Sequence, residues 1–237
     1  RRRDPEPDLG AFEVNTRFPE PRAVVDAAAF RPPLAPGGLA TLFGENLADI
    51  TASAAALPLP TALAGVAVLV EGRAAPLLYV SPVQINFQLP YEAPATGRFT
   101  VVRTGFSSVA APYAGAPSAP AIFAGGIVHA STGRPVTAAE PARAGQFVSI
   151  YATGLGALAP PGVPTGQAAS TPAPVAAPVR VRFNATAVTP SYAGLAIGYA
   201  GLYQVNVQAP SGMSGAVQVE LDAGGVLSPA VMMVVTP

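Results

Sequence analysis

The sequence predicts an all-β protein made of two tandem immunoglobulin-like β-sandwiches with an N-terminal extended arm. Three observations predict this fold class. Short apolar stretches alternate with turn residues at sandwich spacing, one set of motifs occurs twice in the same order, and no stretch keeps a helical period over three turns. Proline also interrupts nearly every candidate helix, and proline removes a helix hydrogen bond.

Composition supports folded domains rich in turns. Hydrophobic residues make up 50% of the 237 residues and charged residues only 11%, which excludes disorder driven by charge. The chain contains 24 Gly and 28 Pro, as expected for many short strands joined by turns. Its length suits two sandwiches of roughly 100 residues each. The sequence therefore has enough apolar surface for two separate cores.

An internal duplication carries the domain prediction. Three segments return in order with growing offsets, as expected when loops lengthen between matching strands: Val24–Ala27 as Ile127–Ala130, Gly37–Phe43 as Gly145–Tyr151, and Gln84–Pro90 as Gln204–Pro210. We therefore expect an arm over residues 1–19, one sandwich over 20–125 and a second over 126–237.

Seven strands are expected in each copy. In the first they are Val24–Ala28, Gly38–Phe43, Gly65–Val70, Ala74–Tyr79, Val83–Leu89, Phe99–Thr104 and Val109–Ala114. In the second they are Ile127–Ala130, Phe147–Ala152, Pro178–Phe183, Ala187–Tyr192, Leu202–Gln208, Ala216–Leu221 and Ala230–Val235.

The repeated Gln-x-Asn-x-Gln strand places amides on one face. In copy one, Gln84, Asn86 and Gln88 alternate with apolar residues that face the core. Two interpretations stay open for this open-face amide row. It binds a carbohydrate or a neighbouring sheet, or it solvates the face and hydrogen-bonds nearby loops.

Each copy also contains a long Pro/Ala-rich connection, over 47–64 and 157–177. Loops of this length are often functional or mobile. The alternative is an ordered strap that covers a sheet edge and blocks unwanted pairing.

Several segments together resemble a known family. Ala142–Gly156, Tyr192–Leu195 and Gly201–Pro210 resemble the Solibacter-type uncharacterised C-terminal domain of secreted acidobacterial proteins. Ala35–Leu47 resembles its usual upstream partner domain, and both are similar to the IPT/TIG branch of immunoglobulin-like folds. The resemblance implies an extracellular or cell-surface location and no assigned activity.

The sequence offers little for catalysis, so we predict that the protein is not an enzyme and has no cofactor and no catalytic or metal site. His129 is the only histidine, cysteine is absent, and no Gly-x-Ser-x-Gly elbow occurs. Glu220 and Asp222 share a strand face that is expected to be solvated. Asp4, Glu6 and Asp8 could recruit calcium, although a charged tether is the preferred interpretation.

The partners that composition excludes are equally clear. All 13 basic residues are Arg and they form no stripe beyond the first three residues, so no nucleic-acid partner is expected. No apolar run is long enough for a membrane span.

The arm leads to the main functional prediction. Phe12, Val14, Thr16 and Phe18 alternate with polar residues, as in a spare amphipathic strand. Added to a neighbouring subunit, this intersubunit strand would give a non-catalytic fibre or surface layer, with copies of the chain as partners. The alternative is a monomeric cell-surface module for adhesion or for binding a glycan or a surface protein.

Overall fold

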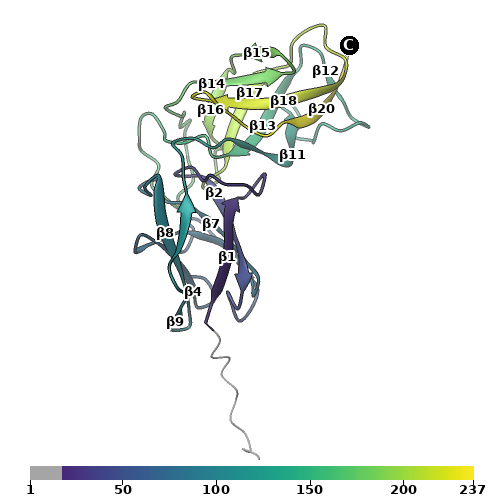
Figure 1. The fold of residues 1–237 in the computed structure, drawn as a ribbon. Coiled ribbons are helices and arrows are strands. Elements are labelled where there is room, and N and C mark those ends of the chain that lie inside the picture. The colour runs from purple at the N-terminus through teal and green to yellow at the C-terminus, as the bar shows by residue number, and fades with distance from the viewer. Residues whose placement is uncertain (1–17) are drawn as a thin grey trace, which may run out of the picture.

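The structure is a computed structural model that describes residues 18–237. These residues form strands and no helix, arranged as two β-sandwiches that lie end to end (Figure 1). The all-β fold class is therefore confirmed.

The first sandwich consists of two sheets. One, called sheet 1A, has the order β1-β2-β7-β6-β3, with β1 Glu20–Asp26, β2 Leu39–Glu45, β3 Ala52–Ser53, β6 Leu77–Val80 and β7 Gln84–Gln88. The other has the order β10-β8-β4-β5 with β9 also on β8, and comprises β4 Val66–Val70, β5 Arg73–Ala74, β8 Thr96–Arg103, β9 Phe106–Ser107 and β10 Ala111–Ala114.

The second sandwich repeats this plan. Sheet 2A has the order β11-β13-β17-β16, with β11 Ala121–His129, β13 Phe147–Thr153, β16 Tyr192–Leu195 and β17 Tyr203–Gln208. The facing sheet has the order β12-β20-β18-β14-β15 with β19 also on β18, and comprises β12 Ala142–Arg143, β14 Val179–Phe183, β15 Thr186–Val188, β18 Gly215–Ala223, β19 Val226–Leu227 and β20 Val231–Thr236.

Each sandwich buries its own core. Alternate side chains of the two facing sheets point inward, including Ile85 and Phe87 in the first and Val205 and Val207 in the second. Each fully buried aliphatic or aromatic side chain contributes on the order of 1.5–3 kcal/mol. Because the two clusters share no buried residue, each sandwich holds its sheets in place separately.

Three of the expected elements have other bounds in the structure. Pro76 divides the strand expected over Ala74–Tyr79 into β5 and β6, and the stretch expected over Ala187–Tyr192 divides into β15 and β16. β11 already pairs with β13 at Ala121, ahead of the boundary expected at 126.

The two long connections are ordered, which favours the strap interpretation. In the first, β3 pairs with the edge strand β6. In the second, Pro174 bridges to Gly194 of the edge strand β16, and Ala169 bridges to Ile197. Each connection therefore occupies a sheet edge that would otherwise be open to another strand.

Candidate functional site

The outward sides of sheets 1A and 2A carry the same arrangement of side chains. The first face consists of Thr41, Phe43, Tyr79, Gln84 and Asn86, and the second of Ser149, Tyr151, Tyr192, Gln204 and Asn206. Strand register places these residues directly opposite one another: Thr41, Asn86 and Tyr79 form one row, matched by Ser149, Asn206 and Tyr192. Phe43 lies opposite Gln84, as Tyr151 lies opposite Gln204.

A small hydrogen-bond network organises the amides of the first face. Asn86 Oδ1 accepts bonds from Gln84 Nε2 at 2.8 Å and from Thr41 Oγ1 at 3.1 Å. Both amide side chains are partly exposed. Asn86 Nδ2 and Gln84 Oε1 have no hydrogen-bond partner among the described residues, so the face offers one donor and one acceptor to a ligand.

The second face repeats this network. Asn206 Oδ1 accepts bonds from Gln204 Nε2 at 2.8 Å and from Ser149 Oγ at 2.9 Å. The Thr-to-Ser difference between the copies keeps the donating hydroxyl. The same donor and acceptor, Asn206 Nδ2 and Gln204 Oε1, therefore remain available.

Aromatic rings lie beside the amides on both the first and the second face. The Phe43 ring is 36% exposed and packs against the exposed Phe30, with 6.0 Å between ring centroids. In the second face, the Tyr192 hydroxyl donates to Leu195 O at 2.7 Å, which holds the ring close to Gly194. These rings are fixed by packing or hydrogen bonding, so they offer apolar surface at low entropic cost.

The third amide of each motif follows the other interpretation. Gln88 Nε2 donates to Gly37 O at 3.0 Å, and Gln208 Nε2 donates to Gly145 O at 2.8 Å. These glutamines hydrogen-bond loops. Only the first two amides of each motif thus remain as candidates for ligand binding.

His129 has a structural role, as does its counterpart Asp26. The His129 ring contacts Glu140 O and Gln146 Nε2, both at 3.1 Å. The Asp26 carboxylate accepts backbone N–H bonds from Ala28 and Arg31 in the following turn. Both side chains order loops at the end of their sheets.

The acidic candidates do not form a site either. Glu220 and Asp222 lie directly opposite Arg182 and Arg180 on β14, so an arginine is the cross-strand neighbour of each acidic residue. Within residues 18–237, no group of three His, Cys, Asp or Glu side chains is placed to hold a metal ion. The segment with Asp4, Glu6 and Asp8 lies outside the described residues.

The arm prediction is only partly open to inspection. Phe12, Val14 and Thr16 lie outside the described residues. Phe18 is 59% exposed and packs edge to face on Phe106 of β9, with ring centroids 5.5 Å apart. This contact is made within the chain, and the role of the arm as an intersubunit strand stays a prediction.

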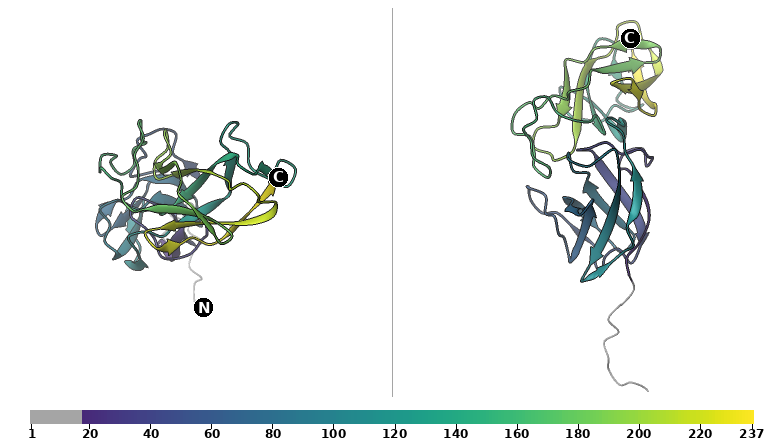
Figure 2. Two further views of the ribbon diagram at one scale, coloured as in Figure 1. Left: turned by 90° about the horizontal axis from the view of Figure 1, so that it is seen from above. Right: turned by 60° about the vertical axis from the view of Figure 1, so that its left-hand side comes forward.

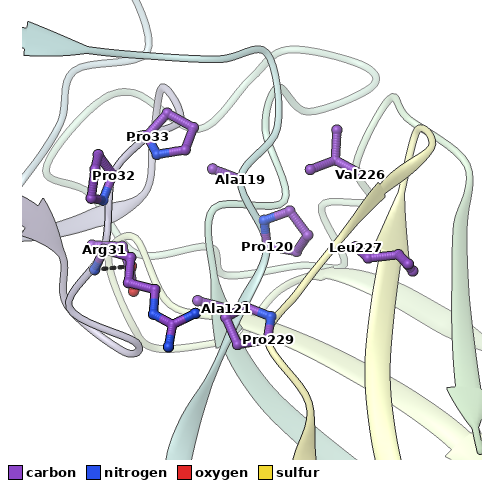
Figure 3. A pocket seen from close by; sticks show the side chains of 10 residues that line it. Arg31, Pro32, Pro33, Ala119, Pro120, Ala121, Val226, Leu227 and Pro229 are labelled. Carbon is purple, nitrogen blue, oxygen red and sulfur yellow. Dashed lines mark hydrogen bonds between the residues drawn. The ribbon is translucent and has the colours of Figure 1, made fainter.

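A cavity of about 290 Å³ lies where the two sandwiches meet (Figure 3). Arg31, Pro32 and Pro33 approach it from the β1–β2 connection, and Val226 and Leu227 from the β18–β19 hairpin. Its walls are mainly proline rings and aliphatic side chains, and Asp26 and Arg31 are the charged residues in its lining. We place the candidate site on the two faces because the same amide network recurs on both of them.

The amides were visible in the sequence, whereas their aromatic neighbours were not. Tyr79 and Tyr192 lie on separate strands and reach the amides only through register. One signal was available: the repeat aligns Phe43 with Tyr151, which marks an aromatic at the same place in both copies.

Comparisons with known proteins give a distant structural likeness. No protein-family profile matches the chain, and no curated protein sequence matches it. SGBP-B of a Bacteroides ovatus mixed-linkage glucan utilization locus, in complex with a mixed-linkage heptasaccharide, overlaps with a TM-score of 0.40 at 13% identity, covering 90% of this chain and 46% of that one. SGBP-B from a xyloglucan locus of Bacteroides uniformis gives 0.29 at 13% identity, covering 92% and 49%. The tandem immunoglobulin repeats of Dlar give 0.23 at 14% identity, covering 92% and 98%. The chain spans about half the length of the first two proteins.

Proposed function

We propose that this chain is a non-catalytic, cell-surface carbohydrate-binding protein whose first and second faces each bind a neutral sugar. The observation that carries the proposal is the recurrence of one unit, an amide donor and acceptor beside an aromatic ring, at equivalent positions of both sandwiches. Structural overlap at the TM-scores above carries no information on ligands, so the support lies in these side chains.

The chemistry of the unit suits a sugar ring. A pyranose presents neighbouring hydroxyl groups, which both donate and accept hydrogen bonds, and a patch of C–H groups that stacks on an aromatic ring. Asn86 Nδ2 and Gln84 Oε1 match the hydroxyl pair, and Phe43 matches the C–H patch. None of the ten side chains of the two faces is charged, which favours neutral sugars over uronic acids.

The location and family belong to the same proposal. The segments that resemble the Solibacter-type domain support a place at the cell surface. No helix in the described part of the chain is long and apolar enough to cross a membrane.

The test measures retardation of the purified chain in native gels that contain neutral polysaccharides, followed by calorimetry. We expect at least one neutral glycan to bind, and the double variant Asn86→Ala/Asn206→Ala to lose that binding. Gln218→Ala is the matched control, because its exposed amide lies on β18 of another sheet. If the double variant stays folded and binds as well as the parent, the faces are not the site.

Self-assembly through the arm stays a separate prediction. Electron microscopy would compare the full chain with a variant that begins at Pro19. Filaments formed by the full chain and not by the shortened one would support strand addition. Monodisperse particles from both would exclude it.

A further inference from the structure

Hydrogen bonds tie the two sandwiches together at their junction. Leu39 N donates to Thr153 Oγ1 at 2.7 Å, and Gly166 N donates to Gln88 Oε1 at 2.7 Å. The long connections also meet there, since Leu59 N donates to Gly166 O at 2.8 Å. The contacts come from β2, β7, β13 and the two long connections, so the junction is a broad interface. Figure 2 shows the second sandwich resting on the end of the first.

These contacts involve the outward sides of sheets 1A and 2A. Leu39 and Gln88 lie opposite each other on the outward side of sheet 1A, at the end nearest the second sandwich. Thr153 continues the outward set that contains Ser149 and Tyr151 on β13. Gln88 and Thr153 are each only 1% exposed because the other sandwich covers them.

This mutual covering brings the outward sides of the two sheets together at the junction. The β16–β17 loop lies against the outward end of sheet 1A at Leu39 and Gln88, and Thr153 at the outward end of sheet 2A accepts a hydrogen bond from Leu39 N, so the two outward sides meet at the junction. The loop at this seam also exposes an aromatic ring: Gly201 contacts Leu39 and Gln88, and Tyr199 in the same turn is 58% exposed.

The junction leaves little freedom for the sandwiches to move. A Cβ at Gly201 would lie 2.7 Å from Leu39 Cδ2, and a Cβ at Gly38 of the first sandwich would lie 3.1 Å from Thr153 Oγ1 and 3.2 Å from Gly154 N of the second. Such close backbone approach holds only in one arrangement. The two faces are therefore presented at a fixed spacing.

We propose that the two faces bind one linear, neutral polysaccharide chain at the same time, with the ligand crossing the seam beside Tyr199. This inference rests on the proposed function of the faces. A polymer of repeating sugars offers the same hydroxyl pattern at regular intervals, which matches two equivalent units at a fixed spacing. Once one face is occupied, the second binds at a high effective concentration, which raises the affinity without new contacts.

The experiment is calorimetry with oligosaccharides of increasing length cut from the polysaccharide that binds. Short oligosaccharides are expected to occupy two weak sites per chain. Once the oligosaccharide spans both faces, the stoichiometry should fall to one and the affinity should rise by about 100-fold. Asn86→Ala or Asn206→Ala alone should return long oligosaccharides to the weak affinity.

The possible outcomes distinguish the shared ligand from the proposed sugar binding by each face. Two weak sites with an affinity independent of length would overturn the shared ligand and leave the sugar-binding faces intact. No binding at any length would overturn both. A Gly-Ser insertion after Pro117 in the linker provides a second test: it should lower the affinity for long oligosaccharides and leave that for short ones unchanged. Equal affinity of the insertion variant for long oligosaccharides would contradict a fixed spacing.

Discussion

The side chain of Gln88 joins the two sandwiches. Its Nε2 donates to Gly37 O in the first sandwich at 3.0 Å, while its Oε1 accepts the backbone N–H of Gly166 from the second at 2.7 Å. Its counterpart Gln208 makes only the first kind of bond, to Gly145 O, and is exposed. Because of the duplication, equivalent glutamines occur in two environments: Gln88 is buried at the junction, and Gln208 is exposed to solvent.

This difference predicts unequal costs for the same substitution. Gln88→Ala leaves a buried N–H and a buried carbonyl without partners and should lower the free energy of unfolding by about 2–3 kcal/mol. Gln208→Ala should cost under about 0.5 kcal/mol, because water replaces the lost bond. Urea unfolding monitored by tyrosine fluorescence measures both. Equal losses would show that the junction bond contributes nothing of its own.

Tyr91 and Tyr203 predict a stability that depends on alkaline pH. Burial raises the pKa of Tyr91 to about 12, and the nearby Tyr203 hydroxyl partly opposes that rise. Burial, together with the charge of an ionised Tyr91, also raises the pKa of Tyr203. An unfolded chain loses the Tyr91 proton near pH 10, its ordinary pKa, while the folded chain keeps it, so stability should fall as pH rises above about 10. In Tyr91→Phe, the unfolding midpoint should fall less steeply over this range.

The same pair predicts opposite effects at neutral pH. The buried Tyr91 hydroxyl has no hydrogen-bond partner of good geometry among the described residues, so Tyr91→Phe should be neutral or stabilising. The Tyr203 hydroxyl donates to Gly156 O at 2.7 Å, and Tyr203→Phe should cost about 1 kcal/mol. Chemical denaturation at pH 7 compares the two variants. A larger loss for Tyr91→Phe would contradict this assignment.

Gly154 is predicted to tolerate no side chain. Its φ of +77° lies in the left-handed region, and a Cβ would collide with Ala119 O in the linker. Gly105→Ala is the matched control, because Gly105 has a φ of +86° and open space around it. Gly105→Ala should cost about 1 kcal/mol from backbone strain, and Gly154→Ala at least ~2 kcal/mol more from the collision. Thermal unfolding of both variants checks this. Similar melting temperatures for the two would contradict the tight linker contact.

Phe43 is predicted to affect binding more than stability. The ring is partly exposed on the first face, so Phe43→Ala should lower stability by about 1 kcal/mol or less. Its loss as a stacking surface should weaken binding of a sugar to the first face by about 5- to 10-fold. Titration calorimetry with a short oligosaccharide measures the change. Val109→Ala serves as the control, since Val109 is 87% exposed and lies outside both faces. Unchanged sugar affinity in Phe43→Ala would remove the ring from the site.

Most of the fold could be predicted from the sequence, because the alternation of side chains along a strand is a local rule. Alternation in Gln84–Gln88 and Gln204–Gln208 predicted which residues enter the cores, since successive side chains of a strand point to opposite faces. The candidate site could be predicted from the sequence only in part. Gln84 and Asn86 were visible as an amide row, but nothing local brings Tyr79 beside Asn86, because their pairing depends on which strands become neighbours.

By itself, the sequence determined the all-β class, the duplication and the outward position of the amides, because periodicity and repetition are properties of the chain. The tertiary structure alone decided which of the equivalent glutamines is buried, which aromatic rings border the amides and how the two sandwiches meet. These features depend on contacts between segments far apart in the chain, such as Leu39 with Thr153 and Gln88 with Gly166. Such contacts follow from the shape of the folded surfaces, and no local pattern of residues records them.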